Sequence, residues 1–289
     1  MLKTYLFALI VGVQAIFGLN ATVEFVDNPV DLSSRPVAET IVSREDYALA
    51  KRQEDYLLKL TEMGIKLHPG TDFAKDSVDN PVQMKQCASL VYRTLSVMPP
   101  ETVKKLKNLT LYFNSTGRRG LGGGSTIILR CQNVSDKELV SVLVHELGHI
   151  QDTGVLSGAS WTGNSEFVDG QAPVFMNDLS LDFYRISFND EASLKTTAVP
   201  EDFVSGYAMS DPFEDFAETY NYYLLHGDHF RLMLDESEAL RSKYQFMKDV
   251  VFADQEFDYQ TDQIHKITGA RNYDATQVGY NLNNFLANV

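Results

Sequence analysis

The stretch SDKELVSVLVHELGHIQD, residues 135–152, decides how this chain is interpreted. Ser135 followed three positions later by Glu138 is typical of a helix N-terminus, and Gly154 is the expected end of the same helix. Apolar residues recur between them at helical spacing: Leu139, Val142, Leu143, Leu147 and Ile150. The stretch therefore predicts one long helix with a buried apolar side.

The sequence His145-Glu146-Leu147-Gly148-His149 stands inside this helix. Histidines at positions i and i+4 lie on one helix face, where both imidazoles can ligate a single Zn²⁺. The carboxylate of Glu146 can reach a zinc-activated water on the same side. We therefore predict His145 and His149 as ligands of one Zn²⁺ per chain and Glu146 as the general base. The alternative is a helix that only places two histidines near its buried side.

A catalytic zinc site needs a third protein ligand and one open position. A third histidine six residues after His149 is excluded, because that position is Val155. The segment FVSGYAMSDPFEDFAE, residues 203–218, offers Glu214 and Glu218 one helical turn apart, on a helix that we expect over 212–226. One carboxylate can ligate the metal while the other accepts the outer N–H of a metal-bound imidazole.

The chain resembles the gluzincin metallopeptidases in two motifs, HELGH at 145–149 and EDFAE at 214–218. These zinc-binding enzymes are related to the protease domain of anthrax lethal factor and to secreted endopeptidases that cut between two prolines. The resemblance spans about 100 residues and is specific in these two motifs. It implies that Glu214 is the third zinc ligand, that Glu218 supports the site and that Tyr207 stabilises the transition state. Glu218 or Asp215 as the ligand, and Tyr207 as a packing residue, are the alternatives.

These residues predict a zinc-dependent endopeptidase in which Glu146 takes the proton of the attacking water and Tyr207 donates a hydrogen bond to the oxyanion. The N-terminal segment, described below, predicts that this enzyme is secreted. One alternative is a catalytically silent, zinc-bearing binding or surface-interaction module. Another is hydrolysis of a non-peptide ester or amide at the same site.

We expect an α+β fold of the zincin-like type, in which a small sheet within residues 109–131 packs on the HExxH helix and other helices surround it. The expected elements are helices over 43–63 and 81–97, strands over 109–113 and 125–131 separated by a glycine-rich loop over 118–124, and helical patterns over 230–252.

The strand before the HExxH helix lines the cleft in zincins of this kind and pairs with the extended substrate. Ser125, Thr126 and Ile127 begin that strand here, so we predict that they bind substrate. Three nearby cations either contact substrate or are solvated: Arg118, Arg119 and Arg130. His226 and His229 are expected to face solvent.

The N-terminus is typical of an exported protein. Lys3 precedes an apolar run over 5–17, which predicts a signal peptide at 1–21, an extended leader at 22–42 and a peptidase domain at 43–289. An uncleaved anchor is the alternative. Cys87 and Cys131 form a candidate disulfide, worth about 4 kcal/mol by loop closure, with two buried free thiols as the alternative.

Composition limits the partners. The net charge of −14, from 25 Lys+Arg against 39 Asp+Glu, opposes binding to nucleic acid. No apolar stretch after residue 21 approaches the ~20 residues of a membrane span, so we expect no stable membrane insertion of the mature chain. The predicted partner is a peptide or protein substrate, and the chain is expected to be a monomer.

Overall fold

A computed structural model describes residues 56–69, 81–113, 117–259, 261 and 273–287, all within a unit that spans Leu49–Val289. The predicted signal peptide, the leader and the first part of the helix expected over 43–63 lie outside the described residues. The described part of that helix is helical at 56–62. In the described part of the chain, no helix has the combination of length and hydropathy that crossing a membrane requires.

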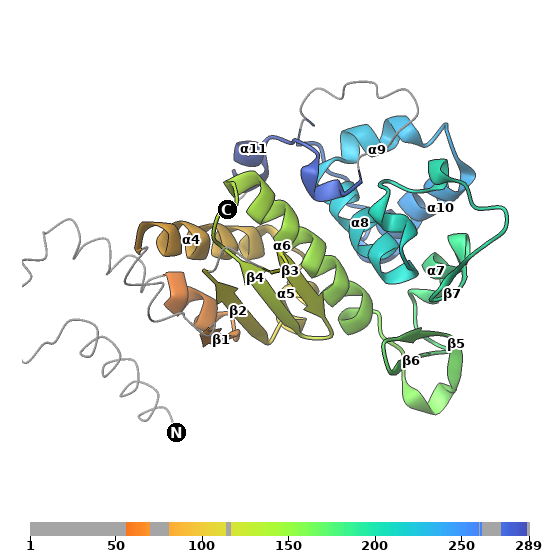
Figure 1. Ribbon diagram of the computed structural model, residues 1–289, viewed down its shortest axis with the longest axis horizontal. Helices are drawn as coiled ribbons and strands as arrows, with labels where there is room; N and C mark the ends of the chain where they lie inside the picture. The colour runs from red at the N-terminus through yellow and green to blue at the C-terminus, as the bar shows by residue number, and fades with distance from the viewer. Residues whose placement is uncertain (1–55, 70–80, 114–116, 260, 262–272, 288–289) are drawn as a thin grey trace, which may run out of the picture. The chain divides into compact units, whose positions relative to one another are not determined.

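A four-stranded sheet with the order β1-β2-β4-β3 forms one layer of the fold (Figure 1). Strands β1 (Lys66–Pro69), β2 (Asn108–Tyr112) and β4 (Thr126–Arg130) are parallel, and β3 (Gly120–Gly123) runs antiparallel to β4 at the edge. Alternate residues of the two central strands are buried: Leu109, Leu111, Ile127 and Leu129. One face of the sheet is therefore apolar and covered by helices.

The glycine-rich stretch expected as a loop is in part strand β3. Glycine has low strand propensity, so the sequence pattern hides this strand, which forms because Gly120 pairs with Leu129 and Gly122 with Ile127. As a result β4 is paired on both sides and Ile127 is fully buried. On the side of β2, the Ser125 carbonyl accepts hydrogen bonds from the N–H groups of residues 107 and 108. Pairing of substrate with Ser125, Thr126 and Ile127 is therefore wrong, and the free edge belongs to β3.

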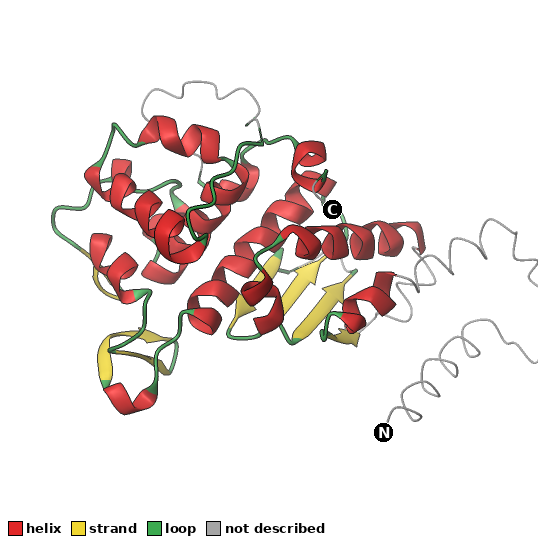
Figure 2. Cartoon of the chain, turned by 180° about the vertical axis from the view of Figure 1, so that it is seen from behind, coloured by secondary structure: helices red, strands yellow, loops and turns green. Residues whose placement is uncertain are grey.

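Helix α6 (Asp136–Ile150) lies between the sheet and the C-terminal helices (Figures 1 and 2). The Ser135 hydroxyl caps it by accepting the N–H of Glu138 at 3.2 Å, whereas the Glu138 carboxylate pairs with Arg119. Gly154 does not stop the helix, which continues through a π-helical turn, Gln151–Val155. A Cβ at Gly154 would lie 2.3 Å from the carbonyl oxygen of Gly124, so this glycine permits close packing.

Helix α4 (Pro81–Val97) has the predicted bounds and packs against α6, and the short α5 (Pro100–Lys105) follows it. One face of α4 is buried, as the apolar spacing of its residues favours: Met84, Cys87, Ala88, Val91 and Leu95. Cys87 forms a disulfide with Cys131, which directly follows β4, and their Cα atoms lie 5.8 Å apart. The disulfide thus joins α4 to the sheet.

The remaining elements form a helical part on the other side of α6 (Figures 1 and 2). Its helices are α7 (Leu181–Ser187), α8 (Pro212–Leu225), α9 (Gly227–Met233) and α10 (Glu238–Phe246), with a π-helical turn at Met247–Val251. The short α11 (Leu282–Leu286) instead contacts α4, where Arg93 donates a hydrogen bond to the carbonyl of Leu286. Two hairpins accompany them, β5 (Asn164–Asp169) with β6 (Ala172–Phe175) and β7 (Phe188–Asp190) with β8 (Ser193–Leu194).

Aromatic side chains fill the core of this helical part. Phe183 of α7, Phe216 of α8 and Phe246 of α10 pack edge to face with ring centroids 5.1–6.2 Å apart. Gly227 directly follows His226, the C-cap of α8, as expected, and it is also the first residue of α9, where a Cβ would lie 2.5 Å from the carbonyl oxygen of Phe257. The mixture of small sheets and helices confirms the predicted α+β class.

Candidate metal centre

Close packing of α6 on α8 brings the two sequence motifs together. A Cβ at Gly148 would lie 2.9 Å from the Cα of Ala217 and 3.2 Å from the Cβ of Tyr220, so glycine at this position lets the helices approach. Asp211 caps α8 by accepting the N–H groups of residues 213 and 214, at 3.0 and 2.8 Å. Glu214 is therefore held in a well-defined first helical turn, opposite the histidines of α6.

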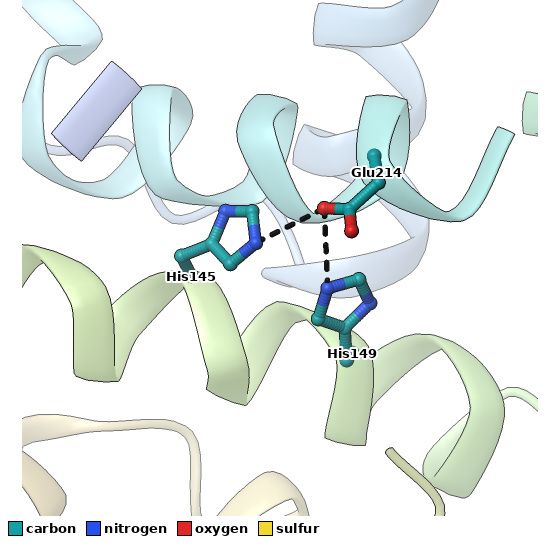
Figure 3. A group of neighbouring side chains, drawn as sticks. All are labelled: His145, His149 and Glu214. Carbon is teal, nitrogen blue, oxygen red and sulfur yellow. Dashed lines mark ion pairs between the residues drawn. The ribbon is translucent and has the colours of Figure 1, made fainter. Parts of the chain in front are cut away.

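The three predicted ligands converge on one point (Figure 3). The Oε2 atom of Glu214 lies 3.2 Å from Nε2 of His145 and 3.4 Å from Nε2 of His149. One candidate ligand atom from each residue lies within 4.8 Å of the others, and the side chains of His145 and His149 are only 9% and 12% exposed. Among the described residues, this trio is the one group of three or more His, Cys, Asp or Glu side chains whose ligand atoms are so close.

Glu218 fixes the orientation of the first imidazole. Its Oε1 atom lies 2.9 Å from Nδ1 of His145, so the Nε2 atom of that ring points to Glu214. The Oε2 atom of Glu218 accepts a hydrogen bond from the Ser205 hydroxyl and another, of 2.7 Å, from the N–H of Ala275. The fully buried Glu218 carboxylate is thus held from three sides.

Asp215, the other alternative ligand, turns away from the histidines. Its carboxylate forms an ion pair of 2.7 Å with the buried Lys243. The Lys243 ammonium also lies 3.9 Å from the centre of the Phe203 ring and donates to the carbonyl of Asp202. Asp215 therefore belongs to the core of the helical part.

The side chain of Glu146 lies against strand β3. A Cβ at Gly120 would lie only 2.2 Å from its Oε1 atom, and one at Gly122 would lie 2.6 Å from its carbonyl oxygen. Burial raises the pKa of Glu146, although the two histidines and the Gly122 N–H oppose the shift. The glycines of β3 thus make room for the residue that we predict to be the general base.

Tyr207 also joins the site. It lies in a 3₁₀ turn, Tyr207–Met209, and its hydroxyl donates a 2.8 Å hydrogen bond to Oε1 of Glu214. Its ring stacks with that of His145 at a centroid distance of 6.3 Å. Burial and the neighbouring Glu214 raise the pKa of Tyr207, so the hydroxyl keeps its proton at neutral pH and can act as a donor.

The carboxylates and imidazoles stabilise one another's charged forms. Burial alone would lower the pKa of His145, but the Glu214 and Glu218 carboxylates raise it well above its ordinary value. Burial opposes ionisation of Glu214, but the two imidazoles hold its pKa well below the usual range. The site is therefore built for positive charge, as a divalent cation requires.

The donor set fits zinc. Two imidazole nitrogens and one carboxylate oxygen, on two packed helices, match the set of three protein ligands that catalytic zinc sites use together with one position for water or substrate. The Oε2 atom of Glu214 is buried between the two imidazoles, where a cation would satisfy all three groups.

Several residues outside the trio differ from the sequence prediction. His226 is fully buried rather than solvent-facing, because its ring packs between Tyr222 and Tyr280. His229 is partly buried, with Nδ1 2.6 Å from the Tyr222 hydroxyl. Neither histidine belongs to the trio.

The arginines near β3 also make internal contacts. Arg119 pairs with Asp274 and Glu138, and Arg130 donates to the carbonyl of Gly117 at 2.6 Å. Arg118 is exposed. Sequence analysis missed Ser205, although it lies within the quoted segment 203–218, because no local pattern marks its contact with Glu218. It also missed Asp274 and Ala275, which reach the site only through the folding of a distant segment.

Comparison with known proteins agrees with this geometry. A family described as "Putative zinc-binding metallo-peptidase" matches residues 136–283, just over half of the chain, and the chain belongs to this family. The matched range contains both motifs and every residue of the trio. No curated protein matches the chain.

Proposed function

We propose that the chain is a zinc-dependent endopeptidase of the gluzincin type with a zincin-like fold. His145, His149 and Glu214 would hold the metal, and Glu218 would keep His145 in the orientation that ligation requires. The observation that carries the proposal is the convergence of two imidazole nitrogens and one carboxylate oxygen beside Glu146 and Tyr207. A bound zinc ion supplies Lewis acidity that activates water and polarises the scissile carbonyl.

The other residues perform the proton chemistry. Glu146 takes a proton from the attacking water and returns it to the leaving amine, for which its raised pKa suits it. Tyr207, which stays protonated, donates a hydrogen bond to the developing oxyanion. A single donor of this kind contributes about 3 kcal/mol to transition-state stabilisation.

The free edge of β3 supports a peptide as the substrate. This strand lies directly against Glu146, and among the residues that the structure describes no other strand pairs with its outer edge. An extended peptide that added to this edge would pass beside the general base. The substrate backbone, rather than a particular side chain, would then provide most of the recognition.

We also propose that the protein is exported and acts outside the cytoplasm. The apolar run at 5–17 after Lys3 supports a signal peptide, and the disulfide between Cys87 and Cys131 suits an oxidising compartment.

The test is the variant Glu146→Gln, compared with wild type on a peptide library and an unfolded protein. We expect hydrolysis to fall by at least a thousandfold while zinc stoichiometry stays near one, and chelation to abolish wild-type activity. Glu101→Gln, which changes an exposed glutamate on α5, is the matched control and should keep full activity. Activity that survives in Glu146→Gln would contradict the proposal, and a zinc-loaded wild type that cleaves nothing would favour the silent binding module.

A further inference from the structure

We propose that residues 273–276 form a strap that positions Tyr207 over the metal centre, and that Arg119 fastens this strap. The inference rests on the proposed function for its kinetic consequence, but the contacts that carry it are independent of the reaction. The strap lies more than fifty residues after Glu218 in the sequence and reaches both sides of the site.

The strap contacts two residues of the site through its backbone. The N–H of Tyr207 donates a 2.6 Å hydrogen bond to the carbonyl of Tyr273, and the N–H of Ala275 donates a 2.7 Å hydrogen bond to Glu218. The ring centroid of Tyr273 lies 5.8 Å from that of Tyr207, and a Cβ added at Gly206 would lie 3.4 Å from Cδ2 of Tyr273. The turn that carries Tyr207 is thus held on its outer side by the strap.

A charged contact fastens the strap to the opposite side of the site. The guanidinium of Arg119, at the start of β3, pairs with the Asp274 carboxylate and donates to the Thr276 hydroxyl at 2.8 Å. The same guanidinium lies 3.2 Å from the Glu138 carboxylate at the start of α6. The Asp274 side chain is only 8% exposed and that of Arg119 is 33% exposed, so loss of the guanidinium would leave a nearly buried carboxylate without its cation.

The position of this pair separates catalysis from metal binding. Arg119 directly precedes Gly120, which packs on Glu146, so one ion pair links the strand beside the general base to the strap beside Tyr207. The metal ligands, in contrast, are held by the direct packing of α6 on α8 and by the Asp211 cap. Glu218 has one contact with the strap, but its contacts with Nδ1 of His145 and with the Ser205 hydroxyl do not depend on the strap. Loosening the strap should therefore displace Tyr207 while the trio stays assembled.

The test compares Arg119→Ala, Asp274→Asn and the double variant with wild type. We expect each single variant to lower kcat tenfold to a hundredfold with KM changed less than threefold and zinc stoichiometry near one. Because the two residues act as a pair, the double variant should be no worse than the poorer single variant. Arg119→Lys should recover part of the kcat, and Arg185→Ala, which breaks the surface pair with Glu166, should leave it unchanged.

Hydrogen exchange supplies a readout that does not depend on hydrolysis. The N–H groups of Tyr207 and Ala275 should exchange slowly in zinc-loaded wild type and in Glu146→Gln, and at least tenfold faster in Arg119→Ala and Asp274→Asn. Asp274→Asn keeps the size of the side chain, so the test can be carried out with this variant alone if Arg119→Ala does not fold. Unchanged exchange of both amides, or an equal loss of zinc and kcat, would overturn the strap. A wild type without hydrolytic activity would refute the proposed function, while the exchange measurement would still decide this inference.

Discussion

Replacing Gly120 by alanine is the sharpest test of how β3 and Glu146 fit together. The new Cβ would lie 2.2 Å from Oε1, 2.7 Å from Cδ and 2.8 Å from Cγ of Glu146. Ordinary contacts between such atoms are about 3.5–4 Å, so the carboxyl group must move by roughly 1 Å or more. The backbone of β3 can stay in place, because the atoms in the way belong to a flexible side chain and Gly120 does not have a positive φ.

The expected effect is large on catalysis and small on stability. A displacement of about 1 Å at a catalytic group can lower the rate a hundredfold, which corresponds to about 2.7 kcal/mol of transition-state stabilisation. Alanine is favoured over glycine within a strand by about 0.5–1 kcal/mol, which offsets part of the crowding. We therefore expect kcat to fall about a hundredfold, with zinc content unchanged and a melting temperature within a few degrees of wild type.

Gly122→Ala is the comparison that makes this prediction specific. Its Cβ would lie 2.6 Å from the backbone carbonyl oxygen of Glu146 and 3.1 Å from its Cα, so helix or strand must shift. This variant should lose stability, by about 1–3 kcal/mol, as well as activity. Steady-state kinetics, zinc analysis and thermal unfolding of both variants show whether each loses activity alone or both activity and stability. Wild-type kcat in Gly120→Ala would refute the placement of the Glu146 carboxyl group beside β3.

Two further predictions concern stability. Burial raises the pKa of Asp152 to about 7, so the folded protein retains a proton that the unfolded chain releases near pH 4. The free energy of unfolding should therefore fall by about 4 kcal/mol between about pH 4 and pH 7 and stay constant at higher pH. Asp152→Asn keeps the oxygen that accepts the hydrogen bond from the Tyr184 hydroxyl, and it should remove this dependence on pH. The check is the free energy of unfolding in urea at pH 5 and pH 8. If wild type and variant differ by the same free energy at both pH values, the prediction is contradicted. The double variant Cys87→Ala, Cys131→Ala should lose about 4 kcal/mol, because the disulfide spans a sequence separation of 44 residues. Equal denaturant midpoints for oxidised wild type and this variant would show that the disulfide adds no stability.

The parts of the fold that depend on local patterns could be predicted from the sequence. Helix α4 has the predicted bounds because an apolar period, a first-turn proline and a closing Pro-Pro pair act within one segment. The end of α6 was less predictable. Gly154 has the sequence position of a helix stop, but it is needed where the backbone of Gly124 approaches, whereas Gly227 both follows the end of α8 as predicted and lies close to the backbone of Phe257. A glycine pattern alone does not distinguish a turn from a close contact.

Strand β3 shows the other limit of local patterns. Its four residues include three glycines, and nothing in that composition favours a strand. The strand exists because β4 offers a partner and because Glu146 needs the space that side chains would fill. The prediction that substrate pairs with β4 was wrong for the same reason, since the neighbour that takes its edge was not recognised.

Helix geometry could have decided among the carboxylates of the third-ligand segment. Residues 214 and 218 lie on nearly one face of a helix, whereas residue 215 is turned by about 100° from residue 214. The Asp215 side chain accordingly points into the core, where Lys243 neutralises it. No sequence rule, however, places Lys243 there. The burial of His226 was likewise unpredictable, because its neighbour Tyr280 comes from the far C-terminal segment.

Metal binding and catalysis at the proposed site depend on different parts of the structure. The ligand trio is held by helix packing within residues 136–225, all of which lie inside the family match. Glu146 and Tyr207 are positioned by β3, which precedes that match, and by the strap near its end. Substitutions in β3 or the strap should then produce proteins that bind zinc normally and hydrolyse slowly. Substitutions that separate α6 from α8, such as Gly148→Leu, should remove zinc and activity together, because no metal site survives the separation of its ligands.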